Sequence, residues 1–195
     1  MRRPLHILFW LTLSMWLALI AAPAMTAISA FTQLPRQGAM IPEYEAYFAE
    51  DPEGMGRMVA GYVTDPVFIA TDRTQWIMAP LALLFGILAL RPFRIGAGPG
   101  QYICLLALTA ALGLVILHNA SMAPRMQENL NAYRTAAAND MRADAEKALA
   151  AFDIDHKIAE PLFGIRMMLV IVGIVAAAGA TRLADREPST TTETG

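Results

Sequence analysis

The side chains best suited to chemistry in this chain stand at the ends of its apolar runs. Asp72 and Arg73 lie at the beginning of one run, His118 ends another, and Arg166 interrupts a third. A charge at the centre of a membrane helix costs about 2.5–3.5 kcal/mol, so such residues usually pair or face a cavity. We therefore predict a shared polar binding cluster, with Asp72, Arg73 and Arg166 at its core and His118 at its edge.

The same charges have a second interpretation. Long cationic side chains near helix ends can extend along apolar surface until the charge reaches the lipid headgroups. Arg73 and Arg166 would then make no cluster at all. The two interpretations differ in geometry, because only a cluster requires Asp72, His118 and Arg166 to converge.

The remaining candidates for metal or catalytic chemistry are isolated. Cys104 is the only cysteine, which excludes an intrachain disulfide and a cysteine-rich metal site. His6 and His156 fall at other depths than His118 and give it no partner for a haem. The sequence has no paired catalytic carboxylates, nucleophile–base set or phosphate loop. We therefore predict no enzyme activity, no cofactor and no bound metal.

One pair of methionines leaves copper open. Met55 and Met58 are spaced to share a helix face with Val59 and Tyr62. Thioethers are soft ligands that suit copper, but methionines at this spacing also serve simply to pack a helix.

Composition places the chain in a membrane. Of its 195 residues 56% are hydrophobic and only 16% are charged, with a mean hydropathy of +0.42. Soluble domains carry about 25% charged residues. The net charge of -2 offers no basic surface for nucleic acid. The predicted fold class is all-α, a polytopic membrane protein built as a four-helix transmembrane bundle.

Four runs approach the roughly 20 apolar residues that cross a bilayer. We expect the second span to begin at Asp65-Pro66, as an N-cap followed by proline at the first helical position. The membrane domain is then 1–182, followed by a disordered cytoplasmic tail at 183–195. The predicted spans are 5–30, 66–90, 101–118 and 161–181.

The arginines orient this bundle. Arg2 and Arg3, Arg91 and Arg94, and Arg182 and Arg186 all fall on one side of four spans. Because basic residues favour the cytoplasmic side, we expect an inner-membrane protein with both termini in the cytoplasm. The first run also resembles a signal peptide ending at Ala22-Pro23-Ala24. Retention is favoured, because the apolar run continues to Phe31 and proline is a poor neighbour for cleavage.

The two outer connections, 31–65 and 119–160, are expected to be helical. Short helices are predicted around 43–49 and 53–63, and a long one over 125–152. Along the long helix the apolar residues form one narrow stripe that must be covered by the first connection, a second copy or the membrane surface. The opposite face is charged and is expected to be solvated. The stripe comprises Met126, Leu130, Tyr133, Ala137, Met141, Ala145, Leu149 and Phe152, and the charged face Glu128, Arg134, Arg142, Asp144, Glu146 and Lys147.

Several short stretches together resemble a known family. They are Ala22-Pro23 in the first span, Gly56-Arg57 before the second and Ala123-Pro124-Arg125 after the third. The chain resembles the transmembrane-protein-205-like family of small four-span membrane proteins, whose bacterial members have no known function. The resemblance implies a fold and a membrane location. It also places Arg166 about where the family commonly has a histidine, after Phe163.

Two functions follow as hypotheses. The absence of catalytic sets and the uncovered stripe favour a structural or interaction protein, bound to the lipid bilayer and to a membrane protein partner or a second copy. The polar cluster and the methionines favour transport of a small solute or a metal such as copper.

Overall fold

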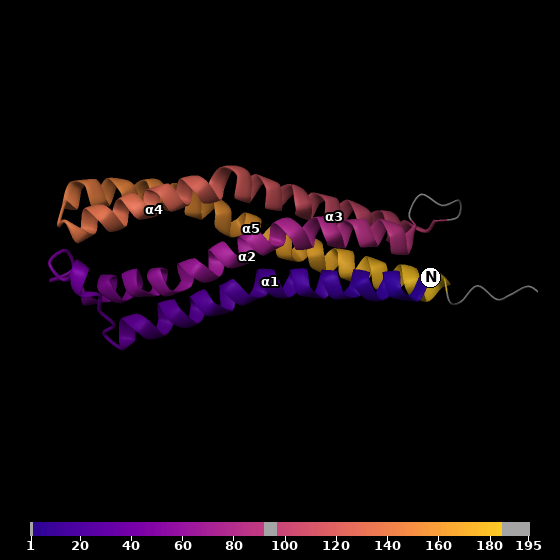
Figure 1. The fold of residues 1–195 in the computed structure, drawn as a ribbon, viewed down its shortest axis with the longest axis horizontal. Helices are drawn as coiled ribbons and strands as arrows, with labels where there is room; N and C mark the ends of the chain where they lie inside the picture. The colour runs from indigo at the N-terminus through magenta and orange to yellow at the C-terminus, as the bar shows by residue number, and fades with distance from the viewer. Residues whose placement is uncertain (1, 92–96, 185–195) are drawn as a thin grey trace, which may run out of the picture.

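The computed structural model describes residues 2–91 and 97–184, and every regular element in this part of the chain is helical (Figure 1). The described residues form five α-helices, a short 3₁₀ turn, η1, between α1 and α2, and a π turn, η2, between α3 and α4. The elements are α1 (Arg2–Arg36), η1 (Pro42–Tyr44), α2 (Pro52–Leu90), α3 (Pro99–Leu117), η2 (His118–Met122), α4 (Ala123–Ala138) and α5 (Arg142–Ala184). The predicted tail, 183–195, lies outside the described residues except for the last two residues of α5.

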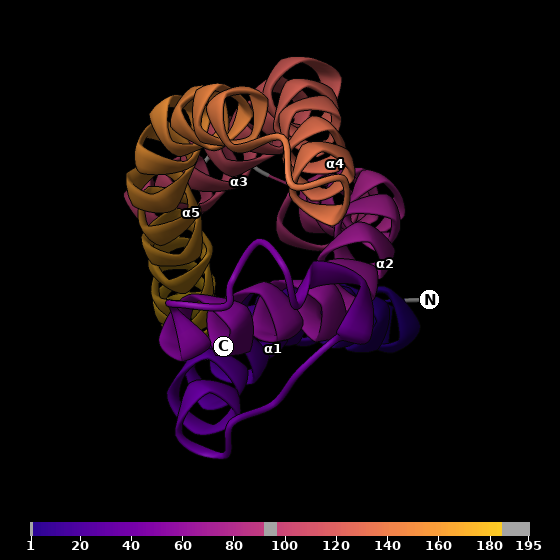
Figure 2. The same cartoon turned by 90° about the vertical axis from the view of Figure 1, so that its left-hand side faces the viewer.

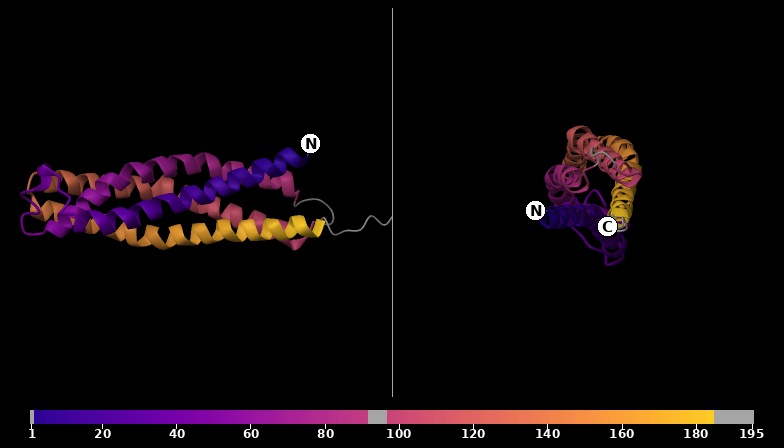
Figure 3. Two further views of the ribbon diagram at one scale, coloured as in Figure 1. Left: turned by 90° about the horizontal axis from the view of Figure 1, so that it is seen from below. Right: turned by 90° about the vertical axis from the view of Figure 1, so that its right-hand side faces the viewer.

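The helices form four long rods that lie side by side (Figures 1 and 3). One rod is made of α3, η2 and α4 in continuous succession. The start of α1, the end of α2, the start of α3 and the end of α5 share one end of the bundle, which we call the terminal end. The loop 37–51 and the turn 139–141 share the other, the hairpin end (left in Figure 1).

These rods are about twice as long as a bilayer is thick. Helices α1, α2 and α5 have 35, 39 and 43 residues. At about 1.5 Å per residue they extend about 50–65 Å, against a hydrocarbon core of about 30 Å. Four helices are long and apolar enough to cross a membrane. The apolar runs fill the half at the terminal end, here called the membrane half; the rest is the hairpin half.

Helix α2 begins fourteen residues before the predicted start, so the prediction of a helix start at Asp65-Pro66 is wrong. Asp51-Pro52 carries the same signal and is the true start, because the Asp51 carboxylate accepts a hydrogen bond from the Gly54 backbone N–H at 2.8 Å. Pro66 lies inside the helix and is exposed. A proline costs a long helix one backbone bond, which the packing of the flanking turns outweighs here.

The predicted long helix over 125–152 is also wrong, because the chain reverses direction at 139–141. Asp140 adopts a left-handed conformation with φ of 51°, which aspartate tolerates better than most residues. Helices α4 and α5 therefore run antiparallel (Figure 2). The alanines on both sides of the turn favour helix, so propensity gives no sign of the reversal.

The membrane half is held together by close packing of small residues between large ones. Lipid offers apolar side chains the same environment as the core does, so helices in a membrane associate through packing. Gly173 approaches the side chain of Leu108, and Gly100 approaches the backbone of Ala176. The buried core comprises Phe9, Leu13, Trp16, Ile20, Ala79, Ala82, Leu90, Cys104, Leu108, Ala111, Val115, Val170 and Ala177.

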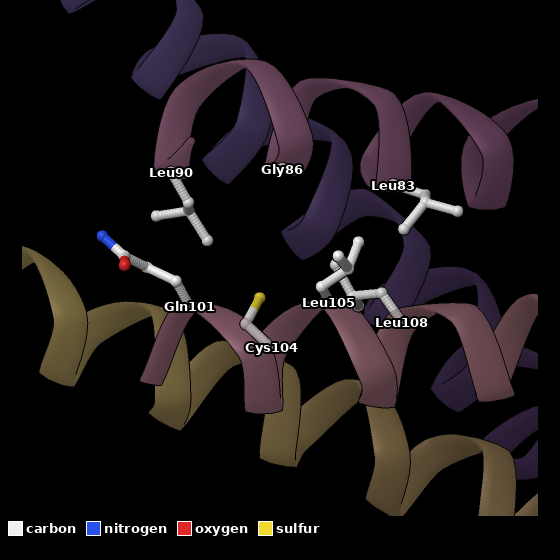
Figure 4. A pocket seen from close by; sticks show the side chains of 7 residues that line it. All are labelled: Leu83, Gly86, Leu90, Gln101, Cys104, Leu105 and Leu108. Carbon is white, nitrogen blue, oxygen red and sulfur yellow. The ribbon is translucent and has the colours of Figure 1, made fainter. Parts of the chain in front are cut away.

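Figure 4 shows how tightly α2 and α3 close. The Cys104 thiol points between the two helices, among leucines from both. The small gap that these residues line has no room for a water molecule. Cys104 is buried and serves here as a small apolar side chain.

The hairpin half has a second, separate core that covers most of the predicted stripe. Tyr133 and Ala137 of α4 and Ala145 of α5 are buried in it. The first connection provides the cover, through the four buried side chains Tyr44, Phe48, Met55 and Met58. Of the three candidate covers, the structure therefore uses the first connection.

One glycine decides how closely α1 and α2 pack in the hairpin half. A Cβ added at Gly56 would overlap the Pro35 backbone, which cannot swing away as a side chain would. Gly61, five residues along the same helix, has only the far edge of the Phe31 ring nearby, at 4.0 Å. Gly56 is therefore required at the crossing and Gly61 is not.

We expect Gly56→Ala to destabilise the protein by about 1–3 kcal/mol, the usual cost of forcing extra volume into a packed site. Gly61→Ala is the matched control and should be neutral or stabilising by up to about 1 kcal/mol, since alanine is the better helix former. Equilibrium unfolding of the detergent-solubilised protein measures both. Equal stabilities for the two variants would show that the helices do not cross at Gly56.

Candidate functional site

A π turn at the junction of α3 and α4 sets up the candidate site. Pro124 follows it as the second residue of α4. Proline has no N–H to donate to the carbonyl four residues earlier, and its ring crowds that carbonyl. The helix therefore widens into a π turn just before the proline. Such turns often occur at functional sites. His118 and Asn119 begin the turn.

His118 and Asn119 both reach the same residue of α2. The His118 Nε2 atom lies 3.3 Å from Asp72 Oδ2, and the Asn119 side-chain amide donates to the Asp72 backbone carbonyl at 3.2 Å. An ionised carboxylate only accepts hydrogen bonds, so this geometry assigns a proton to Nε2. The contact joins α2 to the rod made of α3, η2 and α4, at the level where the apolar runs end.

Arg166 lies inside the bundle on the other side of His118. It is only 2% exposed and sits over the Phe163 ring at 5.0 Å. Its Nε atom is buried without a hydrogen-bond partner, and no described carboxylate forms an ion pair with Arg166. A small void beside it is lined by Leu114, His118, Ala159, Leu162, Phe163 and Arg166.

A further buried polar contact lies nearby. The Trp16 indole N–H donates to the Gln75 side-chain carbonyl at 3.4 Å, and neither residue is exposed. The Gln75 amide nitrogen has no hydrogen-bond partner in the described part of the chain. This contact ties α1 to α2 about one helical turn from Asp72, and the sequence prediction missed it because glutamine carries no charge to mark it.

The structure thus brings together three of the four predicted site residues. Asp72 contacts His118, and His118 shares the void with Arg166. Arg73 is exposed and forms no ion pair with a described carboxylate. Its exposure is compatible with extension to the lipid headgroups, whereas Arg166 is enclosed by protein.

A second pair of oppositely charged side chains, which is buried, joins α2 to α4. It thereby connects the hairpin of α1 and α2 to the hairpin of α4 and α5. Arg134 Nη1 of α4 lies 2.8 Å from Asp65 Oδ2 of α2, and Gln127 donates to the same oxygen at 3.3 Å. The guanidinium stacks over the Tyr62 ring at 4.4 Å. Burial and a hydrogen bond with Tyr62 raise the pKa of Tyr44, which keeps that neighbouring phenol neutral.

We predicted that Arg134 lies on the solvated face, and this is wrong, because Arg134 is only 9% exposed. The other five residues of that predicted face are exposed. Arg134 is four residues after Leu130 and three before Ala137, so it borders the apolar stripe. That spacing is the signal that could have identified it.

The methionines considered for copper lie in the second core. Met55 and Met58 are 4% and 5% exposed and pack against aromatic side chains. Among the described residues, no group of three or more histidines, cysteines and acidic residues is arranged to hold a metal.

Comparison with known proteins finds no matching family model, curated protein or solved structure. The resemblance to the transmembrane-protein-205-like family therefore remains a prediction.

Breaking the buried pair of Asp65 and Arg134 should lower the free energy of unfolding substantially. We expect Asp65→Asn to destabilise the protein by about 3 kcal/mol, because Arg134 would keep its charge in a buried site without a counter-charge. Glu53→Gln removes the partner of Arg57 in a pair whose side chains are 52% and 72% exposed, and should cost less than about 0.5 kcal/mol. Chemical denaturation in detergent compares them. Similar losses in both variants would contradict a buried pair.

Proposed function

We propose that the chain is an interaction protein of the cytoplasmic membrane, whose hairpin half binds a partner protein on the extracytoplasmic side. The observation that carries the proposal is the length of the rods. They exceed the bilayer by about 20–35 Å, and the excess is organised around its own core. A protein that only needed to cross the membrane would not require this second core.

The far end of the hairpin half supplies a candidate contact surface, which we call the acidic tip. It lies on the loop 37–51, the first turn of α2 and the turn 139–141 (left end of Figure 1). Met40 and Met141 are exposed there, at 62% and 49%. The exposed acidic residues of the tip are Glu43, Glu45, Glu50, Asp51, Glu53 and Asp140.

The charges of the tip favour one kind of partner. Arg57 pairs with Asp51 and Glu53, and Arg142 pairs with Asp140. Within the described part of the chain, Glu43, Glu45 and Glu50 form no ion pair. Complementary charge steers and selects partners, so the tip suits a basic protein surface with an apolar centre. A second copy would bring its own acidic tip, and like charges would repel.

The uncovered stripe no longer supports this function, because the first connection covers it. The proposal therefore depends on the rods and on the tip. Transport of a small solute or metal is the second candidate, and the void beside Arg166 and His118 is the observation in its favour. That void has room for about one water molecule, so a wider path would need a second copy or an opening of the bundle.

Site-specific photo-crosslinking tests the interaction. A photoreactive side chain at Met40 should yield a heavier adduct in native membranes, and exchanging Glu43, Glu45 and Glu50 for glutamine should reduce its yield several-fold. Elevated salt should reduce it as well, because exposed charges are screened. The matched control places the crosslinker at Leu106, which is 72% exposed in the membrane half.

An adduct at Met40 that ignores both the triple exchange and salt would contradict recognition by charge. An adduct with twice the mass of the chain would show self-association instead. Recovery of only the monomer would contradict the interaction altogether.

A further inference from the structure

Arg166 has a guanidinium charge that the described protein groups do not neutralise. The residue is only 2% exposed, and its Nε atom has no hydrogen-bond partner. The Phe163 ring offers a weak attraction from one side. The Asp72 carboxylate contacts His118. It attracts the Arg166 guanidinium only from beyond ion-pair distance. Burying a charge under these conditions is unfavourable unless a counter-ion is supplied.

The void beside Arg166 has a composition that selects its occupant. Its polar lining comes from the cationic Arg166 and from His118, and the rest is apolar, with Leu114 and Phe163 among it. It has room for about one water molecule, so it is too small for a phosphate or a carboxylate. Arg166 offers N–H donors to the void, and no carboxylate is among the residues that line it.

We propose that this void binds a single chloride-sized anion between the Arg166 guanidinium and the His118 imidazole. A water molecule would fit the space but would leave the arginine charge without compensation. A halide accepts hydrogen bonds from the Arg166 guanidinium and supplies the missing charge. The proposal concerns the outer level of the membrane half and is independent of any partner at the acidic tip.

Thermal unfolding of the full chain in detergent tests the proposal, with sodium chloride compared against sodium gluconate at equal ionic strength. Chloride should raise the unfolding midpoint in a saturable manner. Arg166→Gln should abolish this response. In gluconate the midpoint of Arg166→Gln should be no lower than that of the natural chain, because the substitution removes an uncompensated buried charge. Arg73→Gln, at a neighbouring depth but exposed, should retain the full response.

Crystals of the natural chain grown in bromide give a second measurement that needs no variant. An anomalous bromide peak between Arg166 and His118 is expected. The absence of a peak, or an equal chloride response in Arg166→Gln, would show that the void holds only water. Stabilisation by anionic lipid in place of chloride would assign the arginine to a headgroup and overturn the proposal as well.

Discussion

The backbone of a helix that enters a bilayer must keep its hydrogen bonds internal until it has left, because lipid offers none in exchange. Most features of this molecule follow from that constraint. No described loop interrupts the rods between the two ends of the bundle. Where Pro124 removes a donor, the chain responds with a π turn and remains helical. Near this π turn, polar side chains contact one another between helices, as His118 contacts Asp72.

Two cores stabilise the rods by different means. In the membrane half, stability depends on shape, and glycines admit the side chain of Leu108 and the backbone of Ala176 at close range. In the hairpin half, water drives apolar side chains together, and aromatic side chains from the first connection close over small residues of α4 and α5. The buried pair of Asp65 and Arg134 lies in this half, so an ionic contact holds the hairpins together beside an apolar one.

The sequence predicted four helical stretches long and apolar enough to cross a membrane, and the structure has them, because long apolar runs are a strong signal. The ends of the helices were harder to place. Asp51-Pro52 and Asp65-Pro66 carry the same local signal. The hydrogen bond of the Asp51 carboxylate with Gly54 and the packing of Gly56 against Pro35 mark the true start. The reversal at Asp140 sits between alanine-rich stretches whose propensity favours one long helix.

The candidate site was predictable in part for a physical reason. Charged residues in apolar surroundings are conspicuous, so depth alone brought Asp72, His118 and Arg166 into one group. Which way each side chain faces depends on helix rotation, which explains why Arg73 was included and proved exposed. The burial of Arg134 was missed because it depends on which helices become neighbours.

We propose that the rods cross the bilayer an even number of times, and that the loop 37–51 and the turn 139–141 lie on the same, outer side. This topology is tested most directly by thiol labelling in right-side-out membrane vesicles, with Cys104 replaced by alanine and single cysteines at Met40, Met141 and Leu106. A membrane-impermeant reagent should modify M40C and M141C and spare L106C. Labelling of only one hairpin, or of neither until the membrane is opened, would contradict the account.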